Sequence, residues 1–168
     1  MSGGADPLLT FEVGEARAAL PLSMVREVVD CPPIVPVPGS HPHVAGVTLS
    51  GGVAVPVYDL RLFPAFWDPP TSAAGGGQPR HLIIVGYGEV VVALLGARTD
   101  LLERVEPETP ESAGEDPIRR EFVRGVVKSG ARSIALLDPE RLFASLGVPA
   151  DGFRSTREDE REENPAGR

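Results

Sequence analysis

The 168-residue chain has few aromatic residues, one cysteine and no long apolar run. Aromatic residues make up 5% of the chain, so aliphatic side chains must fill its core. Cys31 has no second cysteine for an internal disulfide, which fits a reducing cytoplasm. No apolar stretch approaches the roughly 20 residues of a membrane-spanning helix, and residues 1–7 lack the basic and apolar regions of a signal peptide. We therefore expect a cytoplasmic protein without membrane insertion.

The sequence also lacks the motifs that accompany common catalytic sites. Neither Gly75-Gly76-Gly77 nor Gly86-Tyr87-Gly88 is followed by the Lys-Ser/Thr of a phosphate-binding loop. A nucleophile elbow and a zinc-protease motif are absent as well. His41 and His43 have too few neighbouring ligands for a metal site, and nothing beside Cys31 would activate its thiol. We expect no catalytic residue, metal or cofactor.

Acidic residues outnumber basic ones by 24 to 16, which gives a formal net charge of −8. Such a charge repels phosphate backbones, so we expect no nucleic-acid partner. Glycine and proline are abundant, with 19 and 18 residues, and valine is common throughout. This composition is typical of short strands joined by many turns, which predicts an all-β protein.

Short β-type runs separated by turn residues recur along the chain. Between residues 31 and 43 five prolines forbid a helix and favour an extended connection. Asp59 and Asp138 each follow an expected strand and precede an expected helical turn, so we interpret both as structural helix N-caps. The expected strands and strand hairpins cover residues 8–22, 25–29, 44–58, 81–95, 101–105 and 122–137. Outside them we expect a leader at 1–7, a linker at 64–79, and a disordered charged tail at 147–168.

The chain contains an internal repeat with an offset of 79 residues. The offset superimposes six identical residues within sixteen positions: Val44, Gly46, Val47, Ser50, Gly51 and Asp59 fall on Val123, Gly125, Val126, Ser129, Gly130 and Asp138. We therefore predict two copies of one unit, at about 8–63 and 81–143. Five short strands leave open edges unless they close, so each copy is predicted to form a small barrel. A single irregular β-sandwich is the alternative.

Several sequence blocks, taken in their order and spacing, resemble the CheW-like domain over residues 8–146, which is nearly all of the expected ordered chain. The blocks that carry the resemblance are Leu9–Gly14, Ala19–Leu22, Val25–Val29, Pro36–Gly39, Val44–Thr48, Pro56–Arg61, Val123–Val126 and Leu136–Asp138. The resemblance implies two packed SH3-like five-stranded β-barrels, each followed by a short helix. It also implies a non-enzymatic adaptor without a cofactor, which couples the cytoplasmic tips of methyl-accepting chemoreceptors to the regulatory domain of a CheA-type histidine kinase.

The resemblance implies protein-binding positions as well. Val25, Glu27 and Val28 match a strand implicated in partner binding, and Gly46 matches the glycine that opens the second hairpin. Core packing is an equally good explanation for the two valines. The alternative for Glu27 is a solvated strand residue, and for Gly46 it is a backbone requirement. Gly51, a fifth predicted binding position, stands where the family usually has an arginine.

This sequence departs from the family pattern at two places. Leu49-Ser50-Gly51-Gly52 replaces the usual Asn-Leu-Arg-Gly, which removes an arginine that would pair with Glu27. Gly96-Ala97 replaces a Val-Asp pair. Because both changes remove charge or polarity from expected surface, we predict a divergent adaptor that keeps kinase contact and has weakened receptor contact.

Two other functions are open at this point. One is a CheW-like binding module in another motility pathway, based on pili or gliding. The other is a β-barrel sensor or enzyme, with a small-molecule pocket lined by Tyr58, Trp67 or the His41-Pro42-His43 loop.

Overall fold

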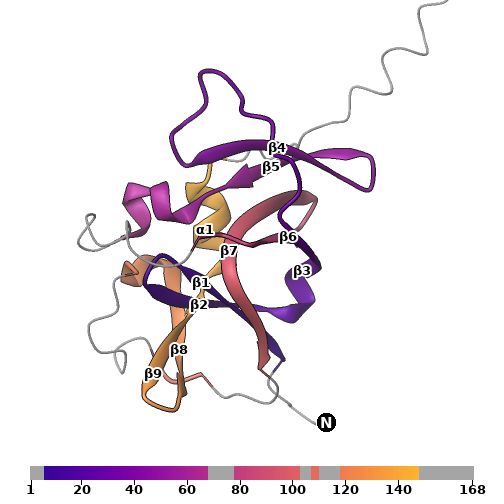
Figure 1. The fold of residues 1–168 in the computed structure, drawn as a ribbon. Helices are drawn as coiled ribbons and strands as arrows, with labels where there is room; N and C mark the ends of the chain where they lie inside the picture. The colour runs from indigo at the N-terminus through magenta and orange to yellow at the C-terminus, as the bar shows by residue number, and fades with distance from the viewer. Residues whose placement is uncertain (1–5, 68–77, 103–106, 110–117, 148–168) are drawn as a thin grey trace, which may run out of the picture.

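The computed structural model describes residues 6–67, 78–102, 107–109 and 118–147, and these residues form a mostly β fold (Figure 1). The strands are β1 (Leu8–Val13), β2 (Ala16–Pro21), β3 (Val25–Asp30), β4 (Val44–Ser50), β5 (Val53–Tyr58), β6 (His81–Tyr87), β7 (Val90–Leu102), β8 (Val123–Ser129) and β9 (Arg132–Leu137). The helical elements are α1 (Pro139–Ser145) and the 3-10 turns η1 (Leu22–Met24), η2 (Leu60–Leu62), η3 (Pro64–Phe66) and η6 (Arg120–Phe122). The prediction of an all-β protein with short helices is confirmed.

Some predicted segments lie wholly or partly outside the described residues. They are most of the leader 1–7 and the linker 64–79, the strand end at 103–105, and the tail 147–168 apart from its first residue. Of the helices in the described part of the chain, none combines the length and apolarity needed to cross a membrane.

The nine strands form two five-stranded groups that share β7. We call them barrel A, with the order β8-β9-β2-β1-β7, and barrel B, with the order β4-β5-β7-β6-β3. In Figure 1 the β4–β5 hairpin of barrel B lies at the top and the β8–β9 hairpin of barrel A at the bottom. Within each barrel one parallel pair, β2 with β9 or β5 with β7, joins strands from different halves of the chain.

This pairing differs from the predicted division at 8–63 and 81–143. The first hairpin of each half, β1–β2 or β6–β7, pairs with the last strands of the other half. The boundaries therefore mark the two repeats but do not separate the two barrels. Sequence similarity between the repeats reveals equivalent strands, whereas the choice of partner strand depends on contacts between distant parts of the chain.

Strand β7 passes from barrel B into barrel A through a bend at Arg98. The register between β1 and β7 shifts between Thr10 and Glu12, where β7 carries the one extra residue of a β-bulge. Arg98 has a φ of 44°, in the left-handed region that side chains other than glycine rarely adopt. Its guanidinium lies 3.8 Å from the Glu12 carboxylate, and Arg17 approaches the same oxygen at 3.7 Å.

The β4–β5 and β8–β9 hairpins, which we call the closing hairpins, are related by the 79-residue offset and share the same backbone geometry. Each hairpin has a bulge at the same place, before Gly46 in β4 and before Gly125 in β8. In each, a residue outside the hairpin forms a bridge to its first strand, Val35 to Val47 in barrel B and Glu108 to Val126 in barrel A. Equivalent backbone hydrogen bonds from Asp59 to His43 and from Asp138 to Phe122 measure 2.8 and 2.7 Å.

Buried residues form one cluster within each barrel and a third, larger cluster between the barrels. Alternate residues of a strand point to different clusters: Leu136 of β9 packs within barrel A, and Leu137 packs in the central cluster. In β5, Val57 packs within barrel B, and Tyr58 packs in the central cluster. The central cluster also buries Leu142, Phe143 and Leu146, so α1 and the residue after it help to join the barrels.

The two predicted N-cap residues lie at the expected ends of strands. The Asp138 carboxylate accepts a hydrogen bond from the Arg141 backbone N–H at 3.1 Å, with Pro139 in the first turn of α1. Asp59 accepts one from the Arg61 N–H at 3.1 Å and also binds the Arg61 guanidinium at 2.7 and 2.9 Å. The pKa of Arg61 is raised, first by the side-chain hydrogen bond to Asp59 and also by the charge of that residue, while burial acts in the opposite direction.

Candidate protein-interaction surface

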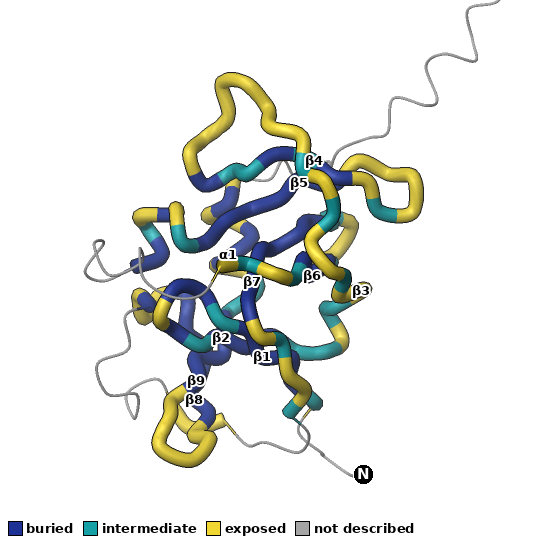
Figure 2. The backbone as a smooth tube through the Cα atoms, viewed as in Figure 1, coloured by how far each residue is buried: buried dark blue, intermediate teal, exposed yellow. Residues whose placement is uncertain are grey.

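One side of the β4–β5 hairpin exposes two large apolar side chains. Leu49 is 72% exposed and Val35 67%. Leu49 lies opposite Ala54 across the hairpin, and Val35 joins it through two 2.9 Å backbone hydrogen bonds to Val47. These contacts make the connection before β4 a third strand-like edge beside the hairpin. We call the exposed residues Val35, Leu49 and Ala54, which lie on one side of the hairpin, the apolar face; Figure 2 shows the exposed backbone of this region.

Strand β3 lies near the turn of this hairpin and carries three of the predicted binding residues. Glu27 and Val28 are exposed, and the Ser50 hydroxyl lies 3.4 Å from a Glu27 carboxylate oxygen. The structure therefore brings Glu27 next to the Ser50-Gly51 turn. Val25 is half-buried and packs against the central cluster, so at least part of its role is core packing.

The two predicted binding glycines have different environments. Gly46 is buried with a φ of 147°, and a Cβ there would lie 2.2 Å from the Val35 carbonyl oxygen. Gly46 thus lets the Val35 edge approach β4 and does not itself reach the surface. Gly51 is exposed in the turn with a φ of 57°, and nothing lies within 4 Å of the place where a Cβ would stand.

The two departures from the family pattern have unequal effects on the surface. At the first, Glu27 forms no ion pair with any described residue, and Ser50 provides its hydrogen-bonding contact. At the second, the expectation of a changed surface is wrong, because Gly96 and Ala97 are buried in β7. A Cβ on Gly96 would already lie 3.2 Å from the Ile83 and Phe11 side chains, so close packing explains glycine there.

The aromatic residues proposed for a small-molecule pocket pack against their neighbours instead. The His43 ring stacks on His41 at 5.4 Å and packs on Phe63 at 4.6 Å. Burial lowers the pKa of His43, as does the neighbouring His41, while burial raises the pKa of Tyr58. The Trp67 indole N–H donates to the Leu60 carbonyl at 2.8 Å. Among the described residues no group of three or more potential ligands is placed to hold a metal ion.

Sequence reasoning missed the apolar face, although the repeat contains a signal for it. The 79-residue offset places Leu49 on Lys128 and Ala54 on Ser133. Residues 44–58 contain no charged side chain, whereas residues 123–137 contain three cations and no anion. Apolar residues at positions where the other repeat is charged indicate a surface that is kept apolar for a contact.

Comparison with known proteins gives a consistent result. The profile of the CheW-like domain matches residues 7–147. The chain is 30% identical over 152 residues to the "Probable chemotaxis protein CheW" of Rhizobium etli, covering 86% of this chain and 91% of that protein. It is also 30% identical over 152 residues to the "Chemotaxis protein CheW" of Rhizobium meliloti, with 86% and 92% covered. The crystal structure of the scaffolding protein TtCheW from Thermoanaerobacter tengcongensis matches with a TM-score of 0.62 at 21% identity, over 79% of this chain and 88% of that one.

Proposed function

The chain belongs to the CheW-like domain family, and on that basis we propose that it couples chemoreceptors to a CheA-type histidine kinase as a cytoplasmic chemosensory adaptor. Proteins of this family are scaffolds and not enzymes. The relatives are named as chemotaxis proteins, and the solved relative is described as a scaffolding protein. The protein therefore acts through the surfaces that it presents to other polypeptides.

The apolar face of barrel B is the observation that carries the proposal. Isolated exposed apolar residues are common, but Leu49 and Val35 are exposed by 72% and 67% on one side of an uncharged hairpin. Interface centres are depleted in charge and rich in apolar contact, as this surface is. The backbone bridge between Val35 and Val47 holds the two edges of the face together before any partner binds, which reduces the entropy lost on association.

We assign the apolar face to the kinase and a weaker contact to the receptor. The regulatory domain of the kinase resembles the adaptor itself, so a barrel surface of similar size and chemistry is available to it. Receptor contact is weakened because Gly51 supplies no cation beside Glu27. A carboxylate without its partner costs binding energy when an interface removes it from water.

Leu49→Asp tests the kinase contact. It places a charge at the centre of the apolar face, so we expect at least a tenfold loss of affinity, about 1.4 kcal/mol, for a purified kinase regulatory domain in titration calorimetry. Leu101→Asp is the matched control: Leu101 is 46% exposed on β7, away from the hairpin, and its substitution should leave the affinity unchanged. Equal losses for the two variants would contradict the assignment.

Gly51→Arg tests the receptor contact. The variant returns a cation beside Glu27, and it should bind a receptor-tip fragment more tightly than the parent protein does. The φ of 57° at this turn adds strain for any side chain, so Gly51→Ala, which has the same strain and no charge, is the control. Tight binding of the receptor tip by the parent protein, together with no binding of the kinase domain, would refute the proposed function in this form.

A further inference from the structure

The loop that leads into strand β4 is held to barrel B only at its ends. Residues 36–42 are all exposed (Figure 2). In the described part of the chain their hydrogen bonds reach only this run itself and the start of β4. One end is fixed by the backbone bridge of Val35 to Val47, and the other by the buried side chain of His43. We call residues 36–43 the anchored loop.

The His43 ring lies among other rings and lacks a polar partner. It stacks on His41 at 5.4 Å and lies 6.1 Å from Tyr58 of β5 and 4.6 Å from Phe63, which has no titratable group. Only 9% of His43 is exposed, and its Nε2 atom has no hydrogen-bond partner among the described residues. Burial of a charge without a counter-ion costs several kcal/mol. Attraction of a cation to aromatic rings offsets only about 0.5–2 kcal/mol of this cost, so the site favours a neutral imidazole.

The titratable groups around His43 supply no negative charge to it. His41 is itself a base, and when protonated it repels a second cation. Burial raises the pKa of Tyr58, so its phenol stays neutral in acid. The backbone N–H of Asp59 binds the His43 carbonyl at 2.8 Å, but the Asp59 carboxylate is already paired with the Arg61 guanidinium at 2.7 and 2.9 Å. A protonated His43 is therefore more stable where its ring reaches water.

The second repeat shows that the fold does not require a histidine at this position. The 79-residue offset places His43 on Phe122, and the two backbone carbonyls accept equivalent hydrogen bonds from Asp59 and Asp138. Both rings lie beside Phe63. An imidazole and a phenyl group thus fill equivalent places, but only the imidazole takes up a proton. A response to pH at this position is therefore confined to barrel B.

We propose that His43 is a pH-sensitive anchor, whose protonation withdraws the ring from the central cluster, frees the anchored loop and loosens the adjoining Val35 edge of the apolar face. Burial and the neighbouring His41 lower the pKa of His43, so release requires a pH below its ordinary value of about 6.5. Release of the loop is a property of this chain alone. Its consequence, weaker binding of the kinase in acid, rests on the proposed function, because Val35 belongs to the face assigned to the kinase.

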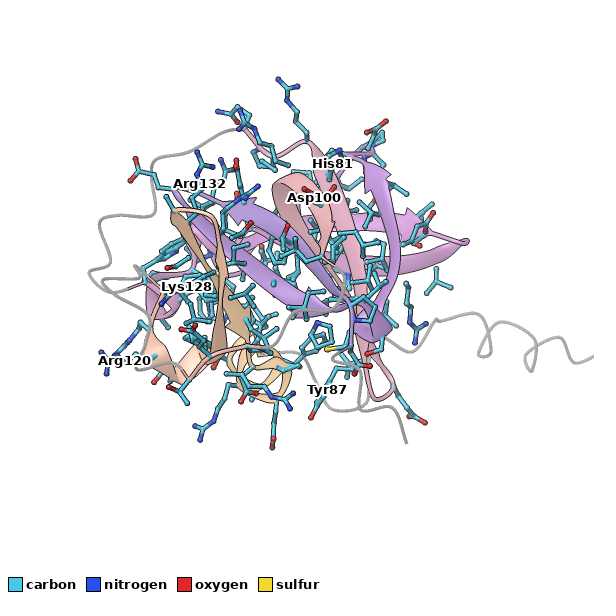
Figure 3. The ribbon with its side chains drawn as sticks, turned by 90° about the horizontal axis from the view of Figure 1, so that it is seen from below. His81, Tyr87, Asp100, Arg120, Lys128 and Arg132 are labelled. Carbon is cyan, nitrogen blue, oxygen red and sulfur yellow. The ribbon has the colours of Figure 1, made fainter. Side chains whose placement is uncertain are left out.

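A nitroxide spin label on the anchored loop of the full chain tests the anchor. Val37→Cys provides an exposed labelling site, and Cys31→Ser removes the single native thiol. Spectra recorded from pH 8 to pH 5 should show one transition to faster motion below about pH 6.5, and adding His43→Phe should abolish it. His81→Phe is the matched control and should retain the transition, because His81, labelled in Figure 3, lies on β6 outside the ring stack and contacts Thr99.

Two results would overturn the anchor. One is label motion that does not respond to pH, or that responds equally in His43→Phe. The other is loss of the far-UV circular dichroism of the strands over the same pH range, because general unfolding then explains the motion of the loop.

Titration calorimetry with the kinase regulatory domain measures the consequence separately. At the midpoint of the label transition half of the molecules are released, so the apparent Kd of the parent protein should be about twofold higher relative to His43→Phe than at pH 7.5. An unchanged ratio would refute control of the apolar face by His43. Absence of kinase binding at pH 7.5 would refute the proposed function, while the spin-label result still decides whether His43 anchors the loop.

Discussion

Replacement of His43 by phenylalanine should stabilise the protein and reduce its sensitivity to acid. His43 is only 9% exposed, and its Nε2 atom is buried without a hydrogen-bond partner in the described structure. The equivalent residue in the second repeat, 79 positions later, is Phe122, which is 1% exposed. Both rings lie beside Phe63, at centroid distances of 4.6 and 6.1 Å. The fold therefore already accommodates phenylalanine at one of its two equivalent positions.

The expected gain follows from the unpaired nitrogen. A buried polar atom without a partner costs about 1–3 kcal/mol, and the phenyl ring removes that cost. The larger ring must fit between His41 and Phe63, which offsets part of the gain, since overpacking costs about 1 kcal/mol or more. We expect the free energy of unfolding of His43→Phe to rise by up to about 2 kcal/mol near pH 7, with about 2–4 °C in Tm for each kcal/mol.

The effect of pH has a defined sign. The pKa of His43 is lowered in the folded protein, mainly by burial and also by His41, so the unfolded chain binds this proton more readily. The contribution of neutral His43 to the free energy of unfolding is therefore fully present above its ordinary pKa of about 6.5. This contribution is lost as the pH falls from there to the lower pKa of the folded state. The slope in that window reaches about 1.4 kcal/mol per pH unit for one proton. His43→Phe removes this contribution.

Urea denaturation at pH 7.5 and pH 5.5, followed by tryptophan fluorescence, measures both effects. Trp67 is the single tryptophan of the chain and is 2% exposed, so its emission reports unfolding of the central cluster. The control is His81→Phe, because His81 lies outside the ring stack and contacts Thr99 at 3.2 Å. The reasoning is refuted if His43→Phe is less stable than the parent at pH 7.5, or if it loses as much stability as the parent on going to pH 5.5.

Three further pairs of variants test features of the backbone by urea denaturation. Arg98→Val should lower the free energy of unfolding by about 1–2 kcal/mol, since a β-branched residue fits poorly at a φ of 44°. Arg98→Gly should leave the free energy of unfolding unchanged. Equal losses for the two variants would contradict strain at the bend. Gly46→Ala should cost about 2–4 kcal/mol and Gly125→Ala less, because their Cβ atoms would lie 2.2 and 2.9 Å from the nearest atom; the reverse order would be inconsistent with the packing described. Asp59→Ala should cost about 2–3 kcal/mol and Asp138→Ala about 1 kcal/mol, since Asp59 is buried and also binds a guanidinium; similar losses would leave the Arg61 pair without a measurable contribution.

The sequence was sufficient to predict the strands and the repeat because both depend on local signals. Ser50-Gly51 and Ser129-Gly130 mark the turns of the two closing hairpins, and Asp59 and Asp138 mark their ends. These residues have fixed conformational preferences, such as positive φ at a turn or a free carboxylate at an N-cap. Their repetition at one offset located the equivalent hairpins correctly.

The exchange of hairpins between the barrels could not be predicted in this way. Parallel pairing of Ala18 with Ala135, or of Val57 with Ala93, joins distant segments through ordinary apolar residues that would suit many partners. The continuity of β7 was missed for a related reason. Gly96 and Asp100 flank Arg98 and are residues typical of turns, so the sequence indicated a break between two strands. The strand instead continues through a bulge opposite β1, which has no local sequence signal.

Of the residues that the resemblance implies for partner binding, Glu27, Val28 and Gly51 lie on the surface, and Gly46 is buried beneath the Val35 edge. Their role in binding stays a prediction. The exposure of the large apolar residues of the hairpin was not predicted, because a leucine such as Leu49 in a strand is typical of a core. The exposure of Leu49 indicates a contact surface only when Leu49 is compared with Lys128, its equivalent in the other repeat.

The shared strand and exchanged hairpins mean that one repeat cannot close a barrel with its own strands alone. A single repeat would have to associate with a second copy, each providing a hairpin to the other, to complete both barrels. Covalent linkage of the two repeats makes this exchange intramolecular. Because residues 44–58 are uncharged and residues 123–137 are basic, the two ends of the pseudo-symmetric molecule are chemically distinguishable.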